Sequence, residues 1–293
     1  MSRFTTLFSR LNNEGAFVPF LMLGDPSPED TLAIVRTLIA AGADALELGV
    51  PFSDPVADGP TIQASHVRAL AGGVGLADAL ALIRTIREEF PRLPLGILVY
   101  GNVPFSRGLD TFYREFAEAG ADAILLPDIP VREGAPFIAA AERAGIDPVF
   151  IAPAQASEAV LESVSAHSKG YIYAVSRDGV TGTEKQSETT GLKEAVEHVA
   201  HFGGAPILLG FGISRPEHVR AAVQAGAAGA ITGSAITRIV EKHCVPDASR
   251  SSHPESHSRS HSEHDLPAYR VDNMEALQAE LGEYVREMKK ATL

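Results

Sequence analysis

Short apolar runs with almost no polar alternation recur along the chain, and each is bounded by glycine, proline or charged residues. These runs lie at residues 17–22, 44–48, 95–99, 122–126, 147–151, 170–175, 206–209 and 228–232. A strand that is apolar on both faces is typical of a parallel sheet that helices cover. The pattern therefore predicts eight buried parallel strands.

Helical patterns separate these strands. They cover residues 28–41, 75–90, 109–119, 133–144, 156–166, 189–202, 215–225 and 233–243, with a last one at 272–290. Several end in the same way, with a glycine suited to a left-handed cap just before the next strand, as in AAGADALELG, EAGADAILLPD and QAGAAGAITGS. Eight alternating units of this kind favour a (β/α)8 TIM barrel over a doubly wound sheet, which usually carries a glycine fingerprint after its first strand.

The length and composition fit one such barrel. The chain has 293 residues, of which 45% are apolar and 21% charged, so it can bury a large core. We expect a single domain over 1–293 with extra helices. Residues 246–268 interrupt the alternation of strands and helices. They are rich in serine and histidine, which cannot supply a core, and we predict a disordered surface insertion there.

The histidines of this stretch raise the question of a metal site. Their spacings of four and three could align imidazoles on a helix, but Pro254 and the many serines disfavour a helix, so no metal site is predicted. The histidines in question are His253, His257, His261 and His264. Elsewhere, His66, His167 and His218 are expected at the surface or at helix ends, without a role.

Charge and cysteine content restrict the classes of partner. The net charge is −12 with no basic block, so neither nucleic acid nor an anionic membrane is an expected partner. The single cysteine, Cys244, excludes an internal disulfide and indicates a reducing compartment. No apolar run reaches the length of a transmembrane helix, and the N-terminus lacks a signal peptide. A cytoplasmic protein is therefore expected.

Acidic residues stand where a barrel enzyme carries its chemistry. Glu47 interrupts the apolar run Ala45-Leu46-Glu47-Leu48, and the following loop, VPFSDPVADGP, contains Asp54 and Asp58. A buried carboxylate is costly without compensation, and active sites of these barrels lie at the C-terminal strand ends. Glu47 and a loop carboxylate are therefore candidates for an acid/base pair. The alternative for Asp54 and Asp58 is turn formation beside proline and glycine.

Glycines follow the last two strands. GFGIS at 210–214 follows the seventh strand, and TGSA at 232–235 ends the eighth and opens a helix. Such loops, with a helix N-terminus behind them, form the usual phosphate cradle of this fold, although glycine also relieves turn strain. After the sixth strand, SRDGVTGT at 176–183 begins a long polar loop, which is either a lid or an ordinary connection.

Five segments together resemble the tryptophan synthase alpha subunit family. They are GAFVPFLMLGDP (15–26), GADALELGVPFSDPVADGPTIQ (42–63), SRDGVTG (176–182), GFGIS (210–214) and AGAAGAITGSAI (225–236). They span most of the chain, and the second is very specific. Departures from the family pattern are the insertion, the stretch YGNVPF at 100–105, where alanine usually follows the tyrosine, and Pro127, which usually is a smaller residue.

The resemblance implies a lyase that cleaves indole-3-glycerol phosphate to indole and glyceraldehyde 3-phosphate. It implies Glu47 as the general acid/base and Asp58 as the second catalytic carboxylate, with Thr181 as a lid residue that reaches back to Asp58. It further implies phosphate held around Gly182, Gly212, Gly233 and Ser234, and an indole pocket at Phe20, Leu98, Tyr100 and Tyr173. No metal or cofactor is implied in this chain.

The resemblance also implies a partner, a pyridoxal-phosphate β subunit in an α2β2 complex that receives the indole. The surface facing it would include Asp54, Pro55, Asn102 and Asp128. Alternatives stay open: a stand-alone lyase that releases free indole, or a non-catalytic subunit that activates a partner. Other phosphate-binding barrels share the late glycines but lack ELGVPFSDPVADGP.

Overall fold

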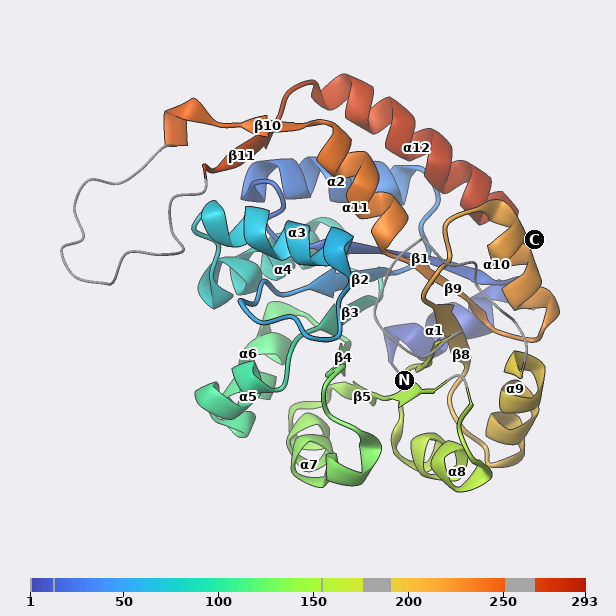
Figure 1. Ribbon diagram of the computed structural model, residues 1–293. Coiled ribbons are helices and arrows are strands. Elements are labelled where there is room, and N and C mark those ends of the chain that lie inside the picture. Colours follow the sequence, from blue (N-terminus) through green and yellow to red (C-terminus); the bar gives the residue numbers. More distant parts are fainter. Residues whose placement is uncertain (1, 13, 154, 176–190, 251–266) are drawn as a thin grey trace.

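The computed structural model describes residues 2–12, 14–153, 155–175, 191–250 and 267–293. Figure 1 shows strands at the centre of the molecule and helices around them. The strands are β1 (Ala16–Met22), β2 (Leu46–Gly49), β3 (Leu95–Leu98), β4 (Ala123–Leu125), β5 (Asp147–Val149), β6 (Ile151–Ala152), β7 (Ile172–Val175), β8 (Ile207–Gly210) and β9 (Gly229–Thr232).

The strands form one parallel sheet that closes on itself. Their order is β5-β4-β3-β2-β1-β9-β8-β7-β6. The two ends of this order, β5 and β6, are consecutive in the chain with only Phe150 between them. The predicted (β/α)8 barrel is therefore confirmed. The fifth predicted strand is divided at Phe150, because the segment before it pairs with β4 and the segment after it pairs with β7.

Side chains of β1 alternate between two cores. Val18, Phe20 and Met22 belong to a cluster inside the barrel, whereas Phe17 and Leu21 belong to the layer between the strands and the helices. All seven residues of β1 are buried, which is why the sequence shows no polar alternation. On β2, the neighbours of Glu47 lie in the outer layer, and the carboxyl group is consequently directed into the barrel.

Helices surround the barrel. They are α1 (Arg3–Leu11), α2 (Pro28–Ala40), α3 (Pro60–Ala71), α4 (Leu76–Glu89), α5 (Asn102–Arg107), α6 (Leu109–Ala119), α7 (Ala135–Ala144), α8 (Glu158–His167), α9 (Leu192–His201), α10 (Pro216–Gln224), α11 (Ser234–Lys242) and α12 (Met274–Lys290), with short 3-10 turns η1 (Val131–Glu133) and η2 (Ala248–Arg250). The nine predicted helices are confirmed to within a few residues, and α1, α3 and α5 are additional.

Two of the additional helices position the site. Helix α1 buries Phe4, Leu7 and Leu11 in the core cluster inside the barrel, and the Phe4 ring lies 4.9 Å from that of Tyr171. Helix α3 follows the acidic loop directly and begins with a proline in its first turn. That proline, with Gly59 before it, starts a helix rather than extending a loop.

The serine- and histidine-rich stretch is bounded by a small antiparallel ribbon. Strand β10 (Cys244–Pro246) pairs with β11 (Tyr269–Val271). In the chain, β10 follows α11 and β11 precedes α12. The predicted insertion at 246–268 therefore begins and ends in paired or hydrogen-bonded backbone, since Asp247 N–H also donates to Ala268 O at 2.7 Å. Of the stretch 246–268 that was predicted to be disordered, Pro246 belongs to β10 and Ala248–Arg250 form η2, while residues 251–266 lie outside the described part of the chain.

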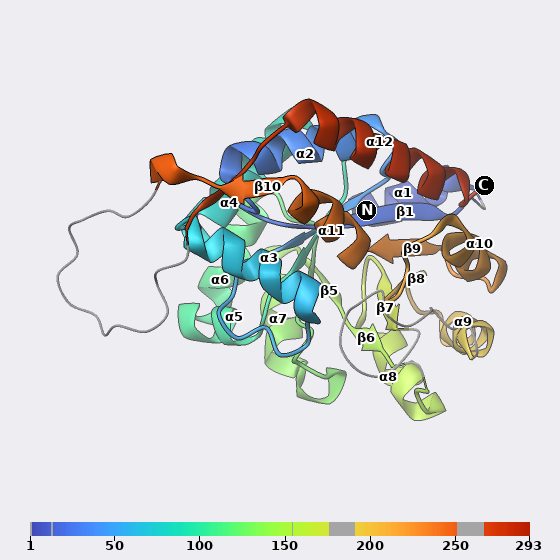
Figure 2. The ribbon, with the colours of Figure 1, turned by 45° about the horizontal axis from the view of Figure 1, so that its top comes forward.

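No single described helix combines the length and apolar character needed to cross a membrane. Taken together, α3 and α4, which are bent by 101° at the break between them, satisfy the criteria of length and composition. Figure 2 gives a second view of both helices.

Candidate active site

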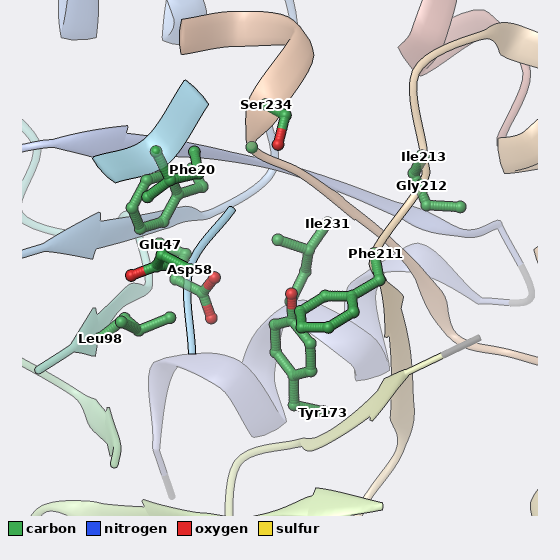
Figure 3. Close-up of a pocket in the computed structure, with 12 residues that line it drawn as sticks. Phe20, Glu47, Asp58, Leu98, Tyr173, Phe211, Gly212, Ile213, Ile231 and Ser234 are labelled. Atoms are coloured by element: carbon green, nitrogen blue, oxygen red, sulfur yellow. The ribbon is translucent and has the colours of Figure 1, made fainter. Parts of the chain in front are cut away.

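A cavity of about 440 Å³, counting the part that is open to solvent, lies at the C-terminal ends of the strands. Figure 3 shows the two carboxyl groups side by side, with Gly212 and Ser234 separate from them. The lining residues come from six strands, the loops that follow them and the first turns of α3 and α11: Phe20, Glu47, Asp58, Ile62, Leu98, Tyr173, Phe211, Gly212, Ile213, Ile231, Gly233 and Ser234. Eight of these twelve were predicted from the sequence.

Glu47 is buried inside the barrel and accepts a hydrogen bond there. Its side chain accepts from the Tyr171 hydroxyl at 2.9 Å, and the residue is only 1% exposed. Burial is the largest influence and raises the pKa of Glu47 to about 8, the hydrogen bond from Tyr171 acts in the opposite direction, and the charge of Asp58 raises the pKa further. Glu47 is therefore protonated near neutral pH and can give a proton to a ligand.

Space for the Tyr171 hydroxyl comes from a glycine on β3. A Cβ at Gly96 would lie 2.8 Å from the Tyr171 oxygen and 3.6 Å from the nearest ring carbons. Because Gly96 pairs with both β2 and β4, its backbone is held on both sides and cannot move away from Tyr171. Tyr171 was not predicted as a site residue. It precedes β7 and lies 124 residues from Glu47 in the chain, so no local pattern joins the two.

Replacing Gly96 with alanine is expected to break the contact between Tyr171 and Glu47. The extra methyl group should displace the hydroxyl and destabilise the fold by about 1–3 kcal/mol, the usual cost of overpacking. Thermal unfolding measures this effect. Adding Tyr171→Phe to Gly96→Ala removes the clashing atom, so the double variant should recover stability relative to Gly96→Ala alone. Equal stability of these two variants would contradict the prediction.

Asp58 is buried by a different set of neighbours. The Tyr100 hydroxyl donates to Asp58 Oδ2 at 2.7 Å, and His66 Nε2 lies 3.2 Å from the same oxygen. Asp58 is 5% exposed, although it lies in the loop between β2 and α3. The site thus contains a carboxyl group kept neutral by burial and a second one that accepts two hydrogen bonds, an arrangement typical of acid/base chemistry.

Glycine residues and a helix N-terminus form the part of the cavity that lies away from the two carboxyl groups (Figure 3). Gly212 has a φ of 71°, in the left-handed region, and Gly233 caps α11 without a side-chain hydrogen bond. The first turn of α11 begins at Ser234, which is 8% exposed. Unpaired N–H groups at such an end favour an anion such as phosphate.

His218 supports the loop that carries Gly212. Its Nδ1 accepts a hydrogen bond of 3.3 Å from the Ser214 backbone N–H, and burial lowers the pKa of the imidazole. The prediction placed His66 and His218 at the surface or at a helix end. It is wrong for His66, which is 1% exposed and lies in the middle of α3, whereas His218 is 8% exposed and does lie at a helix end, in the first turn of α10. His66 was misplaced because α3 was not predicted. His167, the last residue of α8, is exposed as predicted.

The remaining predicted residues fall into three groups. Tyr100 does not line the cavity. Its hydroxyl donates a hydrogen bond to Asp58 and accepts one from Ala57 N–H at 3.1 Å. Thr181 and Gly182 lie outside the described residues. Of the four residues predicted to face a partner, Asp54, Asn102 and Asp128 are exposed and Pro55 is half-buried.

Some lining residues were not predicted from the sequence. Ile62 lies on α3, Ile231 on β9, and Phe211 and Ile213 flank Gly212. Phe211 adopts a positive φ of 60°, which is uncommon for a residue with a side chain. The motif GFGIS identifies this loop, but the direction of the Phe211 ring depends on the conformation of the loop. With Phe20 and Leu98, these side chains give the cavity an apolar wall.

Fold and side chains together define a class: a (β/α)8-barrel enzyme with two carboxyl groups and a glycine-lined helix N-terminus around one apolar cavity. The family model for the tryptophan synthase alpha chain matches residues 8–265. The chain is 64% identical to the tryptophan synthase alpha chain of Corynebacterium diphtheriae over 294 aligned positions that cover 100% of both chains. It therefore belongs to the tryptophan synthase alpha chain family.

Solved structures agree with this assignment. Tryptophan synthase subunit alpha from Legionella pneumophila superposes with a TM-score of 0.79 at 28% identity, covering 100% of this chain and 98% of that one. A chain from the tryptophan synthase complex of Pyrococcus furiosus gives a TM-score of 0.74 at 28% identity, covering 94% and 98%.

Proposed function

We propose that this chain cleaves indole-3-glycerol phosphate by a retro-aldol reaction into indole and glyceraldehyde 3-phosphate. The observation that carries the proposal is the buried carboxyl group of Glu47, whose pKa is raised to about 8, at the wall of an apolar cavity. The cavity offers an apolar wall, which includes Phe20 and Leu98, for contact with an indole ring. The N-terminus of α11 offers a place for the phosphate.

The reaction needs a proton at one carbon and the removal of another from oxygen. Protonated Glu47 gives its proton to C3 of the indole ring, which leaves positive charge on the ring nitrogen. The bond between C3 and the side-chain carbon then breaks, and its electron pair restores the neutral aromatic ring. Glu47, now a carboxylate, takes the proton of the adjacent hydroxyl as that carbon becomes an aldehyde. The proton count balances, and one residue performs both transfers.

Asp58 has a separate task in this scheme. Its carboxylate accepts a hydrogen bond from the ring N–H while positive charge develops on the nitrogen, and so stabilises the protonated ring. The phosphate, held near Gly212, Gly233 and Ser234, fixes the far end of the substrate.

The expectation that this chain needs no metal or cofactor stays a prediction, as does its cytoplasmic location.

The raised pKa of Glu47 predicts how the rate depends on pH. Proton donation to C3 requires the protonated carboxyl group, so kcat/KM should fall about tenfold per pH unit as the pH rises above about 8. Indole release from substrate well below KM, followed from pH 6 to pH 10 at about 25 °C, measures this limb. A kcat/KM that stays level across pH 8 to 10 would rule out Glu47 as the proton donor.

We also propose a tryptophan synthase β subunit, with pyridoxal phosphate, as the partner in an α2β2 assembly. Support comes from the relative in Pyrococcus furiosus, which was solved as a tryptophan synthase complex. Two large apolar side chains are exposed near the mouth of the barrel, Val56 at 72% and Phe105 at 75%. Val56 lies in the loop after β2, and Phe105 lies on α5, the helix that follows β3, in the same segments as three of the predicted partner-facing residues. Exposed apolar side chains beside these residues support a binding surface there.

One assay tests the function and separates it from its alternative. The purified chain is incubated with indole-3-glycerol phosphate, with and without the β subunit of the same organism, and indole is measured. We expect weak cleavage alone and a large increase with the β subunit. High turnover alone would support the stand-alone lyase instead. Absence of cleavage in both conditions would refute the lyase proposal.

A further inference from the structure

One histidine holds both ends of the loop that carries Asp58. This loop runs from Val50 to Gly59, between β2 and α3, and its middle is exposed. His66, on α3, accepts a hydrogen bond at Nδ1 from the Phe52 backbone N–H at 2.9 Å. Its other ring nitrogen, Nε2, lies 3.2 Å from Asp58 Oδ2. The ring therefore connects the start of the loop to its catalytic end.

These two contacts determine where the imidazole carries its proton. A backbone N–H can only donate, so Nδ1 must be the nitrogen that has a free electron pair. The neutral ring then has its proton on Nε2 and donates it to Asp58. His66 is 1% exposed, so water does not compete for either nitrogen. The same ring thus has one acceptor and one donor, and each is used.

A second support comes from Tyr100. Its hydroxyl donates to the same Asp58 oxygen and accepts from Ala57 N–H. The Phe52 and Tyr100 rings stack with centroids 5.2 Å apart and planes 19° apart. Within the described part of the chain, both donors to Asp58 end on Oδ2. This arrangement fixes the plane of the carboxyl group and leaves Oδ1 for the ligand.

We propose that His66 is a positioning residue, which orients Asp58 toward the ring N–H of the substrate through its Nε2–H tautomer. The proposal rests on the proposed function, because it assigns Asp58 the task described above. His66 does not touch the substrate, and it is not among the residues that line the cavity. Its loss should therefore lower kcat much more than it raises KM, since the ground-state contacts to ring and phosphate remain.

Nitrogen NMR tests the tautomer without any assay of activity. With the histidines labelled with ¹⁵N, two-bond proton–nitrogen spectra distinguish Nε2–H from Nδ1–H rings, and His66→Gln identifies the His66 signals by their disappearance. We expect the Nε2–H tautomer in the wild-type chain at neutral pH. The Nδ1–H tautomer would overturn the proposal, because the ring could then not donate to Asp58.

Three substitutions separate the two hydrogen bonds of the ring. Glutamine places an amide N–H near the position of Nε2, asparagine places an amide oxygen near Nδ1, and leucine offers neither. We expect His66→Leu to lower kcat about 10- to 100-fold, the effect of a small misplacement of a catalytic group. His66→Gln should recover most of this loss, whereas His66→Asn should not. His167→Leu, at an exposed histidine, is the matched control.

The outcomes distinguish a failure of this proposal from a failure of the proposed lyase function on which it rests. Wild-type chain without cleavage activity refutes the proposed function, and the tautomer measurement still tests the hydrogen bonds of His66. If the wild type is active and His66→Leu is folded with an unchanged kcat, the positioning role is refuted. Equal losses in His66→Gln and His66→Leu would also refute it, because the donor to Asp58 would then not matter.

Discussion

Replacing Glu47 with glutamine is expected to lower the rate of indole release by about 10⁴-fold. The magnitude follows from the upper end of general acid/base effects, since one residue would perform both proton transfers. Glutamine is nearly isosteric with the protonated carboxyl group and its oxygen can still accept from Tyr171, but it gives no proton to carbon. Quantifying indole in a discontinuous assay measures the loss. Turnover within about tenfold of the wild type would refute the assignment.

The same variant should remain folded, and its stability provides a control. In the wild type, the pKa of Glu47 is raised from 4.5 to about 8 in the native state. The unfolded chain ionises first, so the wild type loses stability as the pH rises from about 4.5 to about 8, by a few kcal/mol. Glutamine does not titrate. The melting temperature of Glu47→Gln relative to the wild type should therefore increase across this range and level off above it.

Substrate binding completes the control. Because turnover by Glu47→Gln should be too slow to consume the substrate during a titration, the affinity for indole-3-glycerol phosphate can be measured directly by calorimetry. We expect an affinity close to the wild-type KM, since the apolar wall and the helix N-terminus are unchanged. A variant that melts normally but does not bind substrate would assign Glu47 to binding rather than to proton transfer.

The strands could be predicted because burial on both faces leaves a direct signal in the sequence. Each strand contributes to the barrel interior and to the helix layer, as the alternation of Phe17, Val18 and Phe20 between two cores illustrates. The division of the fifth strand at Phe150 could not be predicted, because it reflects a change of pairing partner. Helix α3 was missed because its N-terminal glycine and proline were assigned to the preceding loop.

The site could be predicted only as far as local motifs reach. Glu47 and Asp58 lie within one short segment, and their burial follows from a strand and its loop. Tyr171 and His66 determine how these carboxyl groups are held, yet neither belongs to a local pattern that identifies it. Tyr171 reaches Glu47 across the barrel, and His66 reaches Asp58 only because α3 turns the ring back over the loop.

Replacing Asp58 with asparagine is expected to lower kcat about 100- to 1000-fold, the usual effect of losing one group that stabilises developing charge. The hydrogen bonds explain why so similar a side chain should fail. Tyr100 O–H and His66 Nε2–H both donate to the Oδ2 position, which the asparagine oxygen must therefore occupy. Its NH2 group then takes the position of Oδ1 and presents a donor to the ring N–H of the substrate.

This geometry gives a sharper test than the rate alone. An analogue whose ring N–H is replaced by oxygen offers an acceptor instead of a donor. The wild type should prefer the indole compound, and Asp58→Asn should lose or reverse that preference, as measured by competitive binding. Asp110→Asn, at an exposed aspartate on α6, is the matched control for the charge. An unchanged preference in Asp58→Asn would mean that Asp58 does not face the ring nitrogen, and its support by Tyr100 and His66 would then be structural.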